Sequence, residues 1–295
     1  FSMGVGNYTE VDVREASRAF TGWALGAKFP VYPTTRYLWD FEYKPEEHDY
    51  QGKSFLGHSG RFNGEDVIDI IVDQPACARF MARHLYNFFV ADESQVPSWN
   101  VNPPRDEQAI QTLSKAFTDS KGEIRSILRV LFNSDFFKEA HFARVKSPVE
   151  LVVGVQRLVG GYDFPSPYMG QWSMQPTYMG QDIMKPPSVE GWHTGKEWID
   201  SGSLMTRVNF ASELVGDLTR PGVQDIVGRV KKHGTLDPEE FVEVCLDLIG
   251  PLEVRPETRQ ELMEHAHEGG AVKWNTQEET GASAQRVTDM LQLIV

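Results

Sequence analysis

The residues best suited to chemistry lie close together near position 48. His48 is followed by Asp49, and Asp40 and Glu42 precede it at alternate positions of an extended run. A histidine beside carboxylates can bind a divalent metal ion or act as an acid–base pair. The candidate catalytic residues are therefore His48, Asp49, Asp40 and Glu42, and His48 and Asp49 are also the candidate metal ligands. The alternative is structural, because His and Asp side chains often hold a turn by hydrogen bonds.

Residues 162–198 form a second unusual segment, which is rich in aromatic, Met and Pro residues and poor in charge. The sequence Tyr-Met-Gly-Gln occurs in it twice, at 168–171 and 178–181. This composition suits an apolar surface with a few polar anchors that contacts a sugar or a protein. The candidate binding residues are Tyr168, Trp172, Tyr178, Gln181, Trp192 and Trp198. The alternative is that the tryptophans fill the core and the prolines shape a long ordered loop.

The other motifs that could carry chemistry are incomplete. Gly52-Lys53-Ser54 lacks the upstream glycine of a phosphate-binding loop, because residue 47 is Glu. The chain contains no His-Glu-x-x-His and no paired cysteines at metal-binding spacing. The sequence therefore leaves the cofactor unknown.

Composition excludes several classes of protein. The 295 residues include 29 basic and 42 acidic ones, which gives a net charge of −13, and 40% of the residues are apolar. This is a globular composition, and the acidic balance argues against a nucleic-acid partner, which requires a basic surface. No run of 18 apolar residues occurs, so we expect no membrane span.

Hydrophobic periodicity indicates which elements must position these residues. Helices are expected over 9–22, 64–73, 75–88, 105–119, 122–133, 148–160, 201–217, 221–233, 237–249, 256–267 and 283–295. The first helix should bury Val13, Ala16, Ala19 and Phe20. Cys77 and Cys245 fall in apolar helical patterns, which favours two buried thiols.

One extended region is expected. Trp39, Phe41 and Tyr43 alternate with Asp40 and Glu42, which predicts a half-buried strand. We expect it to pair with an extended run at 54–56, so that a hairpin with a long tip spans about 37–57.

The predicted fold class is mainly α: an irregular multi-helix domain with one small β-hairpin and a long Pro/aromatic-rich loop segment. Residues 1–220 are expected to form the main helical domain, with the hairpin and the segment 162–198. Residues 221–295 should form helical hairpins packed on the same domain. Residue 1 is Phe, and an apolar helical stripe runs to the last residue, Val295. We therefore expect a fragment that lacks an N-terminal part.

Several segments together resemble a known family. They include Gly4-Val5-Gly6-Asn7-Tyr8-Thr9-Glu10, Ala19-Phe20-Thr21-Gly22-Trp23, His48-Asp49, Lys146-Ser147-Pro148-Val149-Glu150, Met179-Gly180-Gln181, Pro186-Pro187-Ser188-Val189-Glu190-Gly191-Trp192, Trp198-Ile199 and Arg207 with Asn209-Phe210-Ala211. In order and spacing they are similar to the bacterial family catalogued as domain of unknown function 1800. The resemblance covers nearly the whole chain.

The resemblance implies a periplasmic or secreted protein, since many members begin with an export signal. It supplies no accepted activity, cofactor or catalytic residue. Two hypotheses remain open. In the first, the chain is an exported binding or assembly module that presents 162–198 and the hairpin tip to a partner protein or a polysaccharide. In the second, it is a hydrolase-like enzyme that uses His48 and Asp49, with Asp40 or Glu42.

Overall fold

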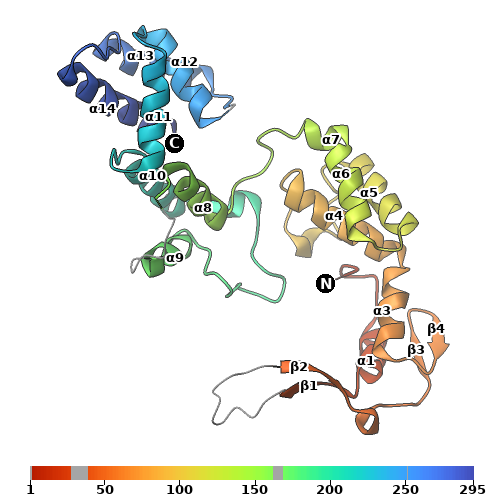
Figure 1. Cartoon of the computed structure of the whole chain (residues 1–295). Coiled ribbons are helices and arrows are strands. Elements are labelled where there is room, and N and C mark those ends of the chain that lie inside the picture. The colour runs from red at the N-terminus through yellow and green to blue at the C-terminus, as the bar shows by residue number, and fades with distance from the viewer. Residues whose placement is uncertain (1, 28–38, 162–168, 251) are drawn as a thin grey trace. The chain divides into compact units, whose positions relative to one another are not determined.

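The computed structural model describes residues 2–27, 39–161, 169–250 and 252–295 (Figure 1). It is mainly α, with two small antiparallel two-stranded sheets, which confirms the predicted fold class. The chain divides into two compact units, Phe1–Arg144 and Val145–Val295. The expected boundary near residue 220 falls inside the second unit, because helices on both sides of it contribute to one core.

The helices of the N-terminal unit are α1 (Glu10–Ala19), α3 (Gly64–Val72), α4 (Pro75–Phe89), α5 (Glu107–Asp119), α6 (Ile124–Asn133) and α7 (Asp135–Lys138). The larger hydrophobic cluster lies between α4, α5 and α6, and α1 packs with α3 in a smaller one. Ile110, Leu113, Ile127 and Leu131 are fully buried between α4, α5 and α6. Thr9 and Asn63 each begin a helix with a reciprocal capping box, which accounts for the starts of α1 and α3.

Two short ribbons lie between α1 and α3 in the sequence. β1 (Trp23–Ala27) pairs with β2 (Trp39–Tyr43), and β3 (Lys53–Phe55) pairs with β4 (His58–Gly60). The predicted pairing of the 37–43 strand with 54–56 is therefore wrong. A two-residue turn, with positive φ at Leu56 and Gly57, closes β3 directly onto β4. β2 was also expected to be half-buried, but all five of its residues are exposed.

The buried face of α1 differs from the predicted one. Glu15 and Ala19 are its buried residues, whereas Val13 is exposed. Glu15 faces inward because its carboxylate accepts a hydrogen bond from Arg18 Nη1 at 2.7 Å. Apolar periodicity alone predicts that such a carboxylate faces solvent.

A buried ion pair organises the loop between α4 and α5. Arg83 Nη2 lies 2.7 Å from a carboxylate oxygen of Glu93, and both side chains are almost completely buried. Arg83 also donates to the backbone carbonyls of Trp99, Asn102 and Pro103. Its guanidinium carbon lies 4.6 Å from the centre of the Trp99 ring. One arginine thus fixes a loop that has little regular structure beyond η2 (Val96–Ser98).

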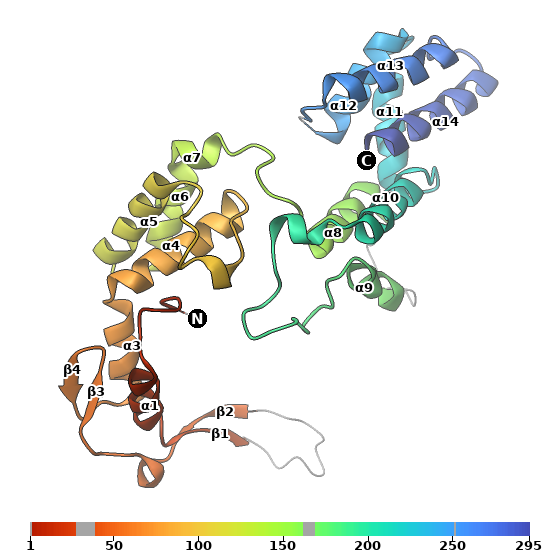
Figure 2. The ribbon, with the colours of Figure 1, turned by 180° about the vertical axis from the view of Figure 1, so that it is seen from behind.

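The C-terminal unit is a helical assembly, seen from behind in Figure 2. Its helices are α8 (Pro148–Val159), α9 (Met169–Tyr178), α10 (Ser201–Val215), α11 (Pro221–Lys232), α12 (Pro238–Ile249), α13 (Pro256–Gly269) and α14 (Gln277–Ile294). Proline occupies the first position of α8, α11, α12 and α13, where its fixed φ suits a helix start and no hydrogen bond is lost.

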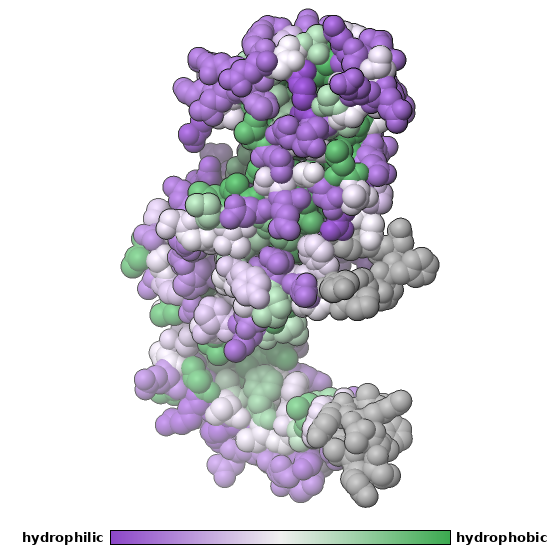
Figure 3. All heavy atoms as spheres, turned by 90° about the vertical axis from the view of Figure 1, so that its left-hand side faces the viewer, coloured by the Kyte–Doolittle hydropathy of each residue, from purple (hydrophilic) through white to green (hydrophobic). Residues whose placement is uncertain are grey.

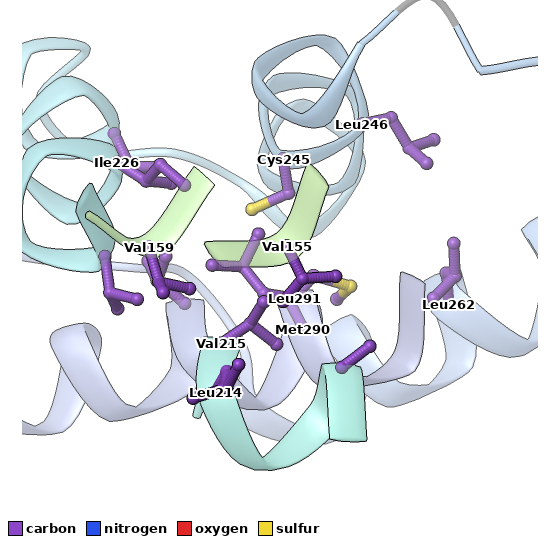
Figure 4. Close-up of a cluster of buried hydrophobic side chains, with 14 of the residues drawn as sticks. Val155, Val159, Leu214, Val215, Ile226, Cys245, Leu246, Leu262, Met290 and Leu291 are labelled. Carbon is purple, nitrogen blue, oxygen red and sulfur yellow. The ribbon is translucent and has the colours of Figure 1, made fainter. Parts of the chain in front are cut away.

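The core of this unit draws on most of its helices (Figure 4). The labelled side chains are Val155 and Val159 of α8, Leu214 and Val215 of α10, Ile226 of α11, Cys245 and Leu246 of α12, Leu262 of α13, and Met290 and Leu291 of α14. Cys77 and Cys245 are both free and buried, as predicted. None of the helices in the described ranges is both long and apolar enough to cross a bilayer.

Part of the segment 162–198 is helical, contrary to the prediction of a long loop. Met169–Tyr178 forms α9, which tolerates Pro176 in its last turn. The second Tyr-Met-Gly-Gln copy ends this helix. Gly180 has φ +97°, and the Gln181 N–H donates to the Pro176 carbonyl at 2.8 Å. A short η3 (Gly195–Trp198) follows before α10.

Candidate functional site

His48 is fixed by a backbone carbonyl at the end of α1. It follows η1 (Pro45–Glu47), and its Nδ1 lies 2.8 Å from the carbonyl oxygen of Thr21. Because a carbonyl only accepts, Nδ1 must carry the proton. The neutral ring then has an unprotonated Nε2. The His48 ring also lies against the rings of Tyr43 and Tyr50, at centroid distances of 5.9 and 4.7 Å.

Asp49 belongs to a network of charges that joins α1 to β3. Arg18 Nε donates to Asp49 Oδ2 at 2.8 Å, and Arg18 also bonds to Glu15. Lys53 is buried and donates to the backbone carbonyls of Asp49 and Gln51. The Arg18 guanidinium, followed by the Gln51 N–H, lowers the pKa of Asp49. Asp49 therefore remains ionised and bound to Arg18.

Asp40 and Glu42 lie on the opposite face of the β1–β2 ribbon from Tyr43, whose ring contacts His48. Side chains alternate along a strand, so Asp40 and Glu42 share one face of β2 and Tyr43 lies on the opposite face. Within the described residues, no three His, Cys, Asp or Glu side chains are grouped so that they could hold a metal ion. His48 and Asp49 are thus neighbours in the chain whose side chains bind different partners, Thr21 and Arg18, and strand alternation directs the two strand carboxylates away from Tyr43 and His48.

The candidate binding residues of 162–198 have different environments. Trp198 is 8% exposed, while Trp172, Gln181 and Trp192 are half-buried. The Trp172 ring packs on the core beside Phe210, at a centroid distance of 6.4 Å. Tyr178 is 63% exposed. Tyr168 lies outside the described residues.

Methionine and aliphatic side chains form most of the exposed apolar area in this segment. Met184 and Val189 are 89% and 86% exposed. We use the name apolar segment for residues 169–199, whose large exposed apolar side chains are Met169, Met174, Tyr178, Ile183, Met184, Val189 and Ile199. Figure 3 shows hydrophobic side chains at the molecular surface between hydrophilic ones.

Three distant segments meet at the N-terminus of α8. Ser147 caps this helix, and the side-chain oxygen of Gln181 accepts the N–H of Val149 at 3.0 Å. Arg207 of α10 donates from Nη2 to the carbonyl of Lys146, directly before the cap. Residues 146–150, 179–181 and 207–211, all part of the resemblance described above, are thus joined around one helix end.

Arg207 has an unusual environment for a cation. It is 7% exposed, and burial lowers the pKa of its guanidinium, an effect that the nearby Glu150 carboxylate opposes. Its Nη1 is buried without a hydrogen-bond partner in the described part of the chain. Buried polar groups are nearly always bonded in native proteins, so this donor requires an explanation.

Sequence reasoning did not assign Arg18 or Arg207 a role in a site. A signal was nevertheless present for Arg207. Arg207 follows a helical spacing of three or four residues with Ser203, Phe210 and Leu214. These residues therefore share one face of α10, and this face is buried. A charged residue on the apolar face of a helix marks a buried polar contact. For Arg18 no comparable signal exists, because its partner Asp49 lies 31 positions away.

Comparison with known proteins identifies a family. No curated protein and no solved structure is significantly similar to the chain. The family model described as "Protein of unknown function (DUF1800)" matches residues 1–295. The chain therefore belongs to the DUF1800 family.

Proposed function

We propose that the protein is an exported binding or assembly module whose apolar segment contacts a partner protein. The observation that carries this proposal is the exposure of Met184 and Val189. Large apolar side chains gathered on one surface stretch often mark an interaction site. Methionine is well suited to such contacts, because its flexible thioether adapts to the shape of a partner.

A protein is favoured over a polysaccharide as the partner. A sugar ring stacks on an exposed aromatic plane, but Trp198 is buried and Trp172 packs on the core. Tyr178 is the exposed aromatic ring of the described part of the segment. A surface polysaccharide therefore remains the second candidate partner, and Tyr178 is the residue on which it would depend.

Site-specific photo-crosslinking in the bacterium of origin tests the proposal. A photoreactive amino acid at Met184 should give a discrete crosslinked protein that mass spectrometry can identify. The same amino acid at Val101, which is 74% exposed in the N-terminal unit, is the matched control. Identical products at both positions, or none at Met184, would reject the proposal. Cell fractionation of the same strain tests export, which we expect to place the protein in the periplasm or the medium.

A hydrolase-like enzyme is the second candidate function, and the observation that favours it is the geometry of His48. Its fixed Nδ1 proton leaves Nε2 able to act as a general base. Asp49 is unsuited to be the acid, since Arg18 keeps it ionised. Elemental analysis of the wild type and His48→Ala tests the metal-dependent form. A divalent metal lost in the variant would favour the enzyme over the binding module.

A further inference from the structure

Two positive features coincide at the N-terminus of α8. The helix spans Pro148–Val159, and the aligned peptide dipoles give its first turn a partial positive charge. Arg207 places its guanidinium at the same end, because Nη2 donates to the carbonyl of Lys146, the residue before the cap. Lys146 itself is exposed and adds a further positive charge. The Glu150 carboxylate in the first turn offsets part of this positive charge.

The hydrogen bonds of Arg207 are incomplete in comparison with those of Arg83 and Arg286. Arg83 donates to Glu93 and to several backbone carbonyls, and Arg286 donates to the carbonyls of Ala266, Gly270 and Ala271. Arg207 is nearly as buried as Arg83, at 7% against 4% exposed, yet its Nη1 has no hydrogen-bond partner among the described residues. A buried cationic donor without an acceptor from the protein calls for another acceptor, such as a bound anion or a water.

The carboxylate near Arg207, that of Glu150, already accepts a hydrogen bond. Glu150 Oε2 accepts the Ser147 N–H at 2.7 Å as part of the capping box. The remaining first-turn donor, the N–H of Val149, is covered by the neutral amide oxygen of Gln181. An oxygen of an incoming anion could replace this amide oxygen, since both are acceptors and the helix end favours negative charge.

We propose that the N-terminus of α8 and Arg207 form a binding site for an oxyanion, a carboxylate or phosphate group of a ligand. The anion accepts from Arg207 Nη1 and, in exchange for the Gln181 side chain, from the Val149 N–H. The donors of this site, Arg207 and the Val149 N–H, are distinct from the exposed apolar side chains of the proposed partner surface, although Gln181, which the anion displaces, belongs to the same segment.

The experiment measures thermal unfolding of the full chain against increasing sodium phosphate, sodium acetate or sodium chloride, at one pH and matched ionic strength. We expect phosphate or acetate to raise the unfolding temperature more than chloride does, and the more effective anion identifies the ligand group. Arg207→Gln should weaken the apparent anion affinity about tenfold or more. Arg286→Gln is the matched control, because Arg286 already has its acceptors, and it should keep the anion effect.

A second variant decides the matter if Arg207→Gln does not fold. Gln181→Ala frees the Val149 N–H and leaves Arg207 in place, so it should bind the effective anion more tightly than the wild type. Two results would overturn the proposal. One is equal stabilisation by all three salts, which would indicate an adventitious ion only or a buried water at Nη1. The other is an anion response that is unchanged in both Arg207→Gln and Gln181→Ala.

Discussion

Gln181 and Val149, which are 32 residues apart, are joined by a hydrogen bond of 3.0 Å from the Val149 N–H to the Gln181 side-chain oxygen. This bond ties the turn after α9 to the first turn of α8. Gln181→Ala should therefore destabilise the C-terminal unit by about 1 kcal/mol, which is typical for the loss of a helix cap. Hydrogen exchange should show faster exchange at Val149. Gln260→Ala, at an exposed site within α13, should leave α8 unchanged.

The contact between α8 and α11 depends on the absence of a side chain at Gly222. A Cβ at this position would lie 2.0 Å from the carbonyl oxygen of Leu158, which is backbone and cannot move aside. Gly222→Ala should cost about 1–3 kcal/mol in the free energy of unfolding. Gly228 lies in the same helix and has open space around it, so Gly228→Ala should stabilise the protein by about 0.5–1 kcal/mol. Chemical denaturation compares the two variants, and equal effects would contradict the close approach.

Removing one partner of the buried Arg83–Glu93 pair should be strongly destabilising. Arg83→Ala leaves the Glu93 carboxylate buried without its cation, and about 3–5 kcal/mol should be lost. The loop around Trp99 should also lose its order, because Arg83 holds three of its carbonyls. Urea denaturation followed by tryptophan fluorescence measures both effects. Arg79→Ala, which breaks the half-exposed pair with Glu107, is the control and should cost about 1 kcal/mol or less.

The attachment of α1 to β3 should weaken at low pH. Arg18 lowers the pKa of Asp49 below its ordinary value of 3.8, so the ionised carboxylate favours the folded state. Its contribution is present above about pH 4 and is lost as the pH falls through the lower pKa of the folded protein. Asp49→Asn should be less stable than the wild type near neutral pH and lose less stability on acidification. Asp119→Asn, in the exposed pair with Lys115, should follow the wild-type acid curve.

Both cysteines should be unreactive in the folded protein. Burial raises the pKa of the Cys245 thiol to about 12 and also raises that of Cys77, so neither forms much thiolate at neutral pH. A thiol reagent should therefore titrate almost no groups in buffer and both groups in denaturant. Rapid reaction of either thiol under native conditions would contradict the burial that the structure shows.

The helices could be predicted from the sequence because each depends on local signals. Thr9, Asn63 and the prolines at helix starts set the boundaries without reference to tertiary contacts. The strand pairing could not be predicted in the same way, since β1 and β2 are joined through a long connection and period-2 alternation does not name a partner. α9 was missed because Pro176 and Gly170 weaken a helical pattern that packing nevertheless supports.

The candidate site was only partly predictable for the same reason. His48 and Asp49 could be found because they are adjacent in the sequence, but their partners Thr21 and Arg18 are not. The inward direction of Trp198 also depends on tertiary packing. Composition places aromatic and Met residues in one segment, and it does not indicate which of them face solvent.

The most direct test of the proposed function is the affinity of the purified protein for the partner that crosslinks through Met184. Titration calorimetry should compare the wild type, the double variant Met184→Glu and Val189→Glu, and the control Val101→Glu. Our account predicts binding at least about tenfold weaker for the double variant and unchanged for the control. Equal affinity in all three proteins would contradict a role for the apolar segment in binding.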